Sequence, residues 1–153
     1  LIQRDLDKHV EKQLVTSLGD LPRTRAFFGR ETELENICAL LDARSSCLLV
    51  PGIAGIGKTA LAGKVIEQYT HRRNLLYHRC QDWEGSRAFL EACAEWLSTI
   101  GDDDLSDYIH ATAVPQASVA VNLIVGALEE VPALIIIDDL HKVNDEVLFA
   151  IIR

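Results

Sequence analysis

A glycine-rich segment that ends in a lysine and a threonine carries the most specific chemistry in the chain. Residues 51–62 have the sequence PGIAGIGKTALA, and Gly52 to Thr59 fit the pattern G-x-x-x-x-G-K-[ST] at every fixed position. Glycines let the backbone curl so that its N–H groups form a concave surface for phosphate oxygens, and a following helix adds the positive end of its dipole. We expect Lys58 to reach the β- and γ-phosphates of a nucleotide and the Thr59 hydroxyl to ligate Mg²⁺. The predicted phosphate-binding residues are Gly52, Ile53, Ala54, Gly55, Ile56, Gly57, Lys58, Thr59 and Ala60. The alternative is a strand-to-helix turn that merely requires glycine.

Two aspartates follow an apolar run about eighty residues later. The segment ALIIIDDLHK, residues 133–142, fits the Walker B pattern of P-loop ATPases. Ligands of parallel sheets bind at the carboxyl ends of the strands, so both side chains would lie near the glycine loop. We expect Asp138 to hold Mg²⁺ through water and Asp139 to orient or activate the attacking water. The alternative is a strand-end turn capped by aspartates, and His141 is interpreted as a surface or capping residue.

Length and composition indicate one soluble domain. The chain has 153 residues, 48% of them hydrophobic and 25% charged, and its longest apolar run, around Ala133 to Ile137, is far too short to span a membrane. The four cysteines form no CxxC pair, which favours buried, reduced thiols and a cytoplasmic location. The chain has no methionine and begins at Leu1, so we expect a segment of a longer protein.

The net charge of −8 is unevenly distributed. Residues 1–30 carry a net charge of +2 and residues 31–153 a net charge of −10, and the stretch 81–110 has eight acidic residues and one arginine. Because nucleic acids bind basic surfaces, we expect no direct nucleic-acid binding by this segment. The acidic stretch itself is interpreted as a solvated helix face plus a loop.

The elements before the glycine loop are expected to be two helices and a strand. Apolar residues at four-residue intervals predict an amphipathic helix or linker over residues 1–20, which ends at Gly19 to Pro22. A second helix is predicted from Glu31 to Ala43, and Cys47 to Val50 is predicted to be a buried strand.

The elements after the loop alternate between helix and strand. Helices are predicted over residues 58–69, 84–100, 105–110, 115–130 and 145–152, and strands over residues 75–79 and 133–137. The last of these strands is apolar on both faces, as a central parallel strand should be. This order predicts an α/β fold with a parallel sheet flanked by helices, in a partial P-loop NTPase domain over residues 21–153.

Three stretches resemble one family. Residues 27–34, with the sequence FFGRETEL, resemble the "hhGRExEL" element of STAND-type signalling ATPases, which are related to AAA+ proteins, and of archaeal initiator-type AAA+ proteins. The Walker B segment, with two aspartates followed by leucine, is similar to the STAND form, and residues 77–104 look like the second-strand region of its archaeal type. The resemblance covers roughly residues 24–150.

This resemblance implies an ATP-dependent switch with ATP or ADP and Mg²⁺ as cofactors. It implies that the element 27–34 packs against adenine, with Phe27 and Phe28 shaping the pocket and Arg30 contacting the nucleotide or holding the segment. Such proteins assemble in a nucleotide-dependent way and carry C-terminal sensor or repeat domains. In such proteins a sensor strand follows Walker B in the sequence. It normally lies between the strand that precedes the glycine loop (Walker A) and the Walker B strand, and we expect this chain to end before it. We therefore expect ATP hydrolysis in the complete protein and weak activity in this segment.

Two other functions remain open from the sequence. One is a replication-initiator ATPase of the AAA+ class, which the acidic body disfavours, and the other is a nucleotide-binding module without turnover. No arginine finger can be assigned, although Arg72, Arg73 and Arg79 are available.

Overall fold

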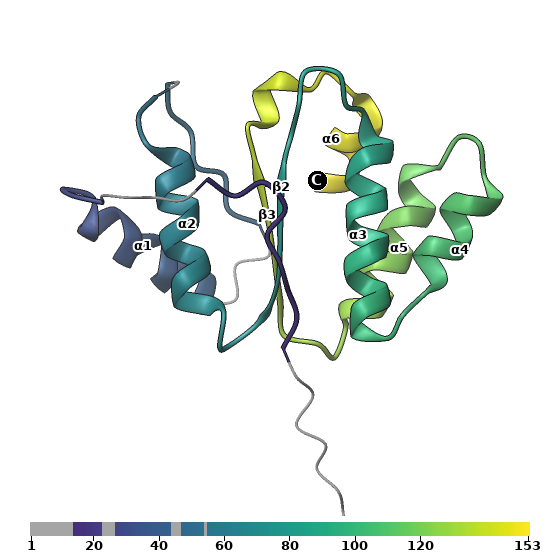
Figure 1. Ribbon diagram of the computed structural model, residues 1–153, viewed down its shortest axis with the longest axis horizontal. Coiled ribbons are helices and arrows are strands. Elements are labelled where there is room, and N and C mark those ends of the chain that lie inside the picture. The colour runs from purple at the N-terminus through teal and green to yellow at the C-terminus, as the bar shows by residue number, and fades with distance from the viewer. Residues whose placement is uncertain (1–13, 23–26, 44–46, 54) are drawn as a thin grey trace, which may run out of the picture.

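A three-stranded parallel sheet organises the protein (Figure 1). The computed structural model describes residues 14–22, 27–43, 47–53 and 55–153. The strands β1 (Thr16–Ser17), β2 (Asn74–Arg79) and β3 (Ala133–Asp138) lie in the order β1-β2-β3. Asn74 pairs with Ala133 at one end of the β2–β3 ladder and Arg79 with Asp138 at the other. Both strands therefore end at the same edge of the sheet.

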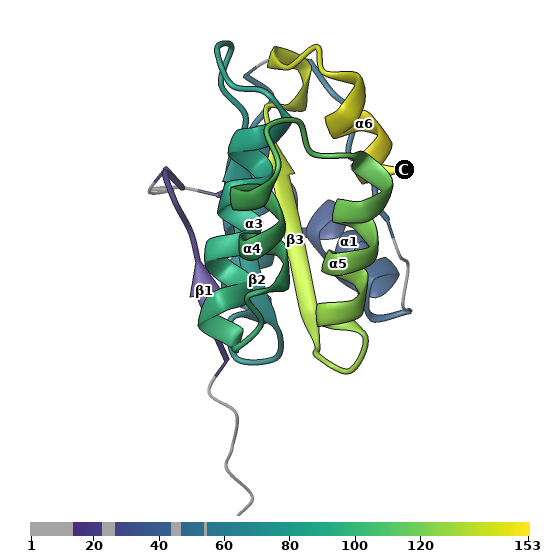
Figure 2. The same cartoon turned by 90° about the vertical axis from the view of Figure 1, so that its right-hand side faces the viewer.

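Helices cover both faces of this sheet (Figures 1 and 2). Two lie on one face, α1 (Glu31–Asp42) and α2 (Lys58–Tyr69). On the other face lie α3 (Ser86–Ile100), α4 (Asp104–Ala111), α5 (Ala117–Leu128) and α6 (Glu146–Ile152). A short 3₁₀ helix, η1 (Leu140–Lys142), follows β3. The prediction of an α/β fold with a parallel sheet flanked by helices is confirmed.

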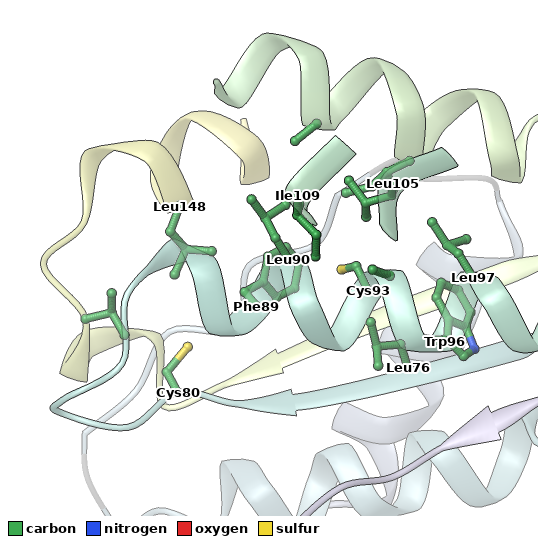
Figure 3. Close-up of a cluster of buried hydrophobic side chains, with 14 residues drawn as sticks. Leu76, Cys80, Phe89, Leu90, Cys93, Trp96, Leu97, Leu105, Ile109 and Leu148 are labelled. Atoms are coloured by element: carbon green, nitrogen blue, oxygen red, sulfur yellow. The ribbon is translucent and has the colours of Figure 1, made fainter. Parts of the chain in front are cut away.

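Strand alternation divides the apolar side chains between two cores. Leu76 of β2 belongs to a cluster of buried side chains that includes residues of α3, α4, α5 and α6, among them Trp96 and Leu97 (Figure 3). Leu75 and Tyr77, the residues before and after Leu76 in the strand, pack on the opposite face with α1 and α2. On β3 the even-numbered Leu134 and Ile136 share that second face, because successive side chains of a strand point to opposite sides.

The prediction of a helix over residues 1–20 is wrong for the part that the structure describes. Residues 1–13 lie outside the described residues, and Thr16 and Ser17 form β1, which pairs in parallel with Leu75 and Leu76. The buried Asn74 holds this edge in register, because its Oδ1 accepts from the Val15 N–H at 2.8 Å and its Nδ2 donates to the Pro132 carbonyl at 3.1 Å. A tertiary partner that the local pattern does not reveal therefore selects the extended conformation.

The predicted buried strand at Cys47 to Val50 is also wrong. The segment has no regular secondary structure, Cys47 is exposed and Leu49 is 75% exposed. Residues 47–52 and β3 line one cavity of about 970 Å³, and no backbone hydrogen bond joins the two within the described residues. Since a strand is stabilised by its ladder partner, the β-rich composition of this segment is not enough to form one.

Two smaller expectations change as well. Within the described residues β3 lies at the end of the sheet, whereas the sequence indicated a central strand, although its side chains do pack on both faces. Of the four free cysteines only Cys80 and Cys93 are buried, while Cys38 is partly exposed and Cys47 exposed.

Candidate nucleotide-binding site

The glycine loop lies immediately before α2, as its sequence predicts. Gly55 and Gly57 have backbone φ angles of 80° and 89°, which are left-handed values that side chains disfavour. Gly57 is the N-cap of α2, and a Cβ there would lie 3.1 Å from a terminal guanidinium nitrogen of Arg30. The first N–H groups of α2 have no acceptor within the helix, so this end of the helix is suited to an anion. Ala54 lies outside the described residues.

Lys58 brings a positive charge to the loop. Its Nζ donates to the carbonyl oxygens of Gly52 at 2.7 Å and Ile53 at 2.9 Å. Among the described residues no carboxylate lies within ion-pair distance of this ammonium group. Its charge therefore stays available to a phosphate group.

Arg30 ties the element 27–34 to the glycine loop. One terminal guanidinium nitrogen donates to the Ile56 carbonyl at 2.8 Å, while Nε and the other terminal nitrogen donate to the two carboxylate oxygens of Glu33 at 2.7 and 2.6 Å. The hydrogen bonds from Arg30 lower the pKa of Glu33, so the pair stays ionised. Phe27 packs partly against the α1–α2 core, whereas Phe28 is 85% exposed beside Gly29. The hydrogen bond from Arg30 to Ile56 joins the residue before α1 to the glycine loop.

The two sequence motifs meet at Thr59 and Asp138. Thr59 lies in the first turn of α2, and Asp138 is the last residue of β3, on the strand face that α2 covers. The Thr59 hydroxyl donates to Asp138 Oδ2 at 2.5 Å, across 79 residues of sequence. The structure therefore brings together the two residues that were predicted to hold a metal ion.

Tyr77 completes this arrangement, and the sequence analysis did not identify it. Its hydroxyl donates to the same Asp138 Oδ2 at 2.9 Å, and the side chain is 2% exposed. Burial, together with the negative charge of Asp138, raises the pKa of Tyr77 far above its ordinary value, so the phenol stays protonated and donates. The other oxygen, Asp138 Oδ1, accepts from the Asp139 N–H at 2.8 Å.

Asp139 lies beside this group but is held by two cations. Its Oδ2 accepts from Arg79 Nε at 2.9 Å and lies 3.0 Å from Lys142 Nζ. Burial would raise the pKa of the Asp139 carboxyl, but the hydrogen bonds from Lys142 and Arg79 outweigh it and the pKa is lowered. Asp139 also has a left-handed φ of 54°, rare for a residue with a side chain. In this arrangement its basicity is reduced.

The remaining candidate side chains lie elsewhere. Arg72 and Arg73 contact Tyr69 and Asp42 at the far end of α2, about 16 Å from Lys58 by the rise of a helix. His141 is an exposed residue of η1, as interpreted from the sequence. Of the three arginines only Arg79 is at the edge of the sheet where β2 and β3 end.

The side-chain oxygen atoms at this edge suit Mg²⁺ only in combination with a bound nucleotide. Mg²⁺ prefers hard oxygen ligands and is often held by one or two carboxylates together with substrate phosphates and water. The described residues contain no group of three or more His, Cys, Asp or Glu side chains that could hold a metal ion. Thr59 and Asp138 fit the metal as partners of a bound nucleotide, and they do not form a complete metal site by themselves.

A protein-family comparison agrees with this geometry. The model of the AAA ATPase domain family matches residues 26–152, which include the element 27–34, the glycine loop and both aspartates. This chain belongs to the AAA ATPase domain family. The prediction of a P-loop ATPase domain related to AAA+ proteins is thereby confirmed. Comparisons with curated proteins and with solved structures find no match.

Within this AAA ATPase domain, no described helix has the length and apolar character required to cross a bilayer. The family match also covers the acidic stretch 81–110, which forms α3, α4 and the loops around them.

Proposed function

We propose that this AAA ATPase domain binds ATP with Mg²⁺ and hydrolyses it as the switch module of a STAND-type signalling protein. The observation that carries the proposal is the hydrogen bond between Thr59 and Asp138, because it joins the two motifs at one edge of the sheet. The family membership supports nucleotide binding and ATPase chemistry. The resemblance of residues 27–34 and of the DDL ending of Walker B supports the narrower STAND assignment, and the resemblance of residues 77–104 supports its archaeal type.

Each side chain of the proposed site has one task. The N–H groups of residues 52–60 bind the phosphates, and Lys58 leaves the carbonyls of Gly52 and Ile53 to bind the β- and γ-phosphate oxygens. Thr59 would ligate Mg²⁺ and Asp138 would hold it through water. The metal, when bound, supplies positive charge to the phosphate oxygens. Asp139 orients the attacking water once it separates from Arg79 and Lys142.

The adenine base is proposed to lie against the element 27–34. Phe28, Ile53 and Ile56 are 85%, 77% and 49% exposed, and the hydrogen bond from Arg30 to Ile56 joins this element to the loop. Exposed apolar side chains beside a phosphate-binding loop provide a surface on which a planar base can pack. In this proposal Phe28 contacts the base, while Arg30 fixes the position of the element and of the loop.

The resemblance to STAND-type ATPases supports activation by nucleotide-dependent assembly. ATP would favour one conformational state of the domain and hydrolysis would return it to the other, so that the bound γ-phosphate sets the populations. The partners would be further sensor or repeat domains and additional copies of the protein, in the cytoplasm.

A second candidate is a nucleotide-binding module without turnover. The observation that favours it is the pair of cations on Asp139, because Arg79 and Lys142 both bind its Oδ2 and lower the basicity with which the carboxylate could activate a water. The replication-initiator alternative shares the resemblance of residues 27–34, but the acidic charge of residues 31–153 disfavours it.

An ATP-binding titration with two lysine variants tests the primary proposal. Lys58→Ala removes the cation at the loop, and we expect ATP affinity to fall about 10- to 100-fold, the value of a charge-assisted hydrogen bond or two. Lys64→Ala is the matched control, because Lys64 is also on α2 but pairs with Glu67 on the surface. Equal ATP affinity in both variants would refute the assignment of the site. Phosphate release by the complete protein separates the switch from the module without turnover.

A further inference from the structure

We propose that Tyr77 is a positioning residue of the Mg²⁺ site, which determines through its hydroxyl group which oxygen of Asp138 faces the metal. This inference rests on the proposed Mg²⁺–ATP function and extends it to a residue that neither motif contains. Tyr77 belongs to β2, whereas the motifs belong to α2 and β3.

The environment of Tyr77 gives the hydroxyl a specific role. The side chain is 2% exposed and lies in the core between the sheet and α2, where a phenylalanine would fill nearly the same volume. A buried hydroxyl must be hydrogen-bonded to offset its lost hydration, and this one donates to Asp138 Oδ2 at 2.9 Å. Its acceptor is therefore the carboxylate predicted to hold the metal.

The hydrogen bonds of Asp138 leave one acceptor position open. A carboxylate has about four lone-pair positions, two on each oxygen. Oδ2 accepts from both Thr59 and Tyr77, and Oδ1 accepts from the Asp139 N–H. The fourth position, on Oδ1, has no donor among the described residues. A metal-bound water would donate its hydrogen bond to Oδ1.

Thr59 and Tyr77 make different contributions to this arrangement. The Thr59 hydroxyl gives its hydrogen to Asp138 and keeps its lone pairs for the metal, but it belongs to the helix that carries the phosphate loop. Tyr77 belongs to the sheet, directly beside β3, with Ile136 as its ladder partner. Its hydrogen bond therefore holds the carboxylate through a rigid element that does not include the loop.

Removing this hydroxyl should weaken the binding of Mg²⁺ and not that of the nucleotide. Tyr77→Phe keeps the ring but leaves Asp138 Oδ2 with one donor fewer in a buried position, so the carboxylate can rotate. Loss of a hydrogen bond to a metal-binding group typically weakens metal affinity 10- to 100-fold, and we expect about a 10-fold higher Mg²⁺ half-saturation. ATP affinity measured without Mg²⁺ should stay within about 2-fold, because the loop and Lys58 are unchanged.

The experiment titrates Mg²⁺ into the full chain with a fluorescent ATP analogue, for the wild type, Tyr77→Phe and Tyr69→Phe. Tyr69 is the matched control: it is fully buried, its hydroxyl binds Asp42 at 2.8 Å, and it ends α2 at the side away from the loop. Only Tyr77→Phe should raise the Mg²⁺ half-saturation. An unchanged half-saturation in Tyr77→Phe, or an equal increase in Tyr69→Phe, would overturn the proposal.

Two further arms keep the failures distinguishable. In an Asp138→Asn background the effect of Tyr77→Phe should vanish, and an effect of full size there would also overturn the proposal. If the wild type binds no ATP, with or without Mg²⁺, the proposed function fails and the role of Tyr77 fails with it.

Should Tyr77→Phe not fold, 3-fluorotyrosine in the wild-type chain gives three ¹⁹F resonances, for Tyr69, Tyr77 and Tyr108. Mg²⁺ added to the ATP complex should shift the Tyr77 resonance and leave that of Tyr69, and a stationary Tyr77 resonance would contradict the proposal.

Discussion

Replacing Asp145 by alanine should destabilise the domain, because this half-buried acid accepts three backbone hydrogen bonds. Its carboxylate is shared between two helices. Oδ1 accepts from the N–H groups of Val147 at 2.8 Å and Leu148 at 3.1 Å and so caps α6, while Oδ2 accepts from the Ser86 N–H at 2.7 Å at the start of α3. One side chain thus joins the segments that follow β2 and β3.

The expected loss follows from these three hydrogen bonds. Loss of an N-cap side chain costs about 1 kcal/mol, and a further hydrogen bond to a charged group contributes about 1.5 kcal/mol. We expect Asp145→Ala to lower the free energy of unfolding by about 2–3 kcal/mol. Asp145→Asn keeps one acceptor oxygen for α6 but cannot accept from Ser86 with its amide nitrogen, so it should lose about half as much.

Urea unfolding followed by circular dichroism measures these differences. Asp103→Ala is the control, because Asp103 is the exposed N-cap residue of α4 and its side chain makes no capping hydrogen bond, accepting instead from the hydroxyl of Ser98 at the surface. Asp103→Ala should lower the free energy of unfolding by about 0.5 kcal/mol or less. If Asp145→Ala costs no more than this control, the shared cap does not stabilise the domain and the reasoning is wrong.

The stabilisation by Asp145 should also depend on pH. Burial would raise the pKa of its carboxyl, but the hydrogen bonds from the backbone at Ser86, Leu148 and Val147 outweigh it and the pKa is lowered. A lowered pKa in the folded state means that the stabilisation is complete above the unfolded-state pKa of about 3.9 and is lost as the pH falls below it. The difference in the free energy of unfolding between the wild type and Asp145→Ala should therefore be constant from pH 7 to pH 5 and shrink below about pH 4.

Three further predictions concern the candidate site. Asp138→Asn should weaken Mg²⁺-dependent ATP binding about 10-fold and leave binding without Mg²⁺ unchanged, which paired titrations with and without EDTA will show; equal losses in both would contradict a metal-holding role. Asp139→Asn should keep ATP affinity within about 2-fold and slow phosphate release at least about 10-fold, and unaltered release would exclude Asp139 as the water-orienting group. Gly57→Ala should cost about 1–2 kcal/mol of stability and reduce ATP affinity, because φ is 89° and the new Cβ would lie 3.1 Å from Arg30; a stable variant with normal ATP affinity would show that the loop tolerates a side chain there.

Local patterns predict most of this fold because each helix carries its own signal. The helix 58–69 was predicted with the bounds that it has, since apolar spacing and the glycine loop define it. β2 and β3 are short apolar runs between turn residues, and both were predicted to within one residue at each end. These elements depend little on where the rest of the chain lies.

The errors occur where a neighbour decides the conformation. Residues 16 and 17 form a strand because Asn74 and β2 offer hydrogen bonds to them, and an apolar spacing of four cannot reveal that partner. Cys47 to Val50 has a strand-like composition but no ladder partner among the described residues. In the same way, the motifs predict that Thr59 and Asp138 meet, while Tyr77 enters the site only through the register of β2 against β3. Alternation along β2 places Tyr77 with Leu75, but only the packing shows that this face turns toward α2.

Calorimetric titration of the wild-type chain with ATP, ADP and GTP, each with and without Mg²⁺, tests the central claim most directly. We predict adenine-nucleotide binding that Mg²⁺ strengthens for ATP and weaker binding of GTP, because the phosphates would lie on residues 52–60, the metal beside Thr59 and Asp138, and the base against residues 27–34. Binding of ATP and GTP with equal affinity would contradict the adenine site, and the absence of binding to any of the three would contradict the nucleotide site itself.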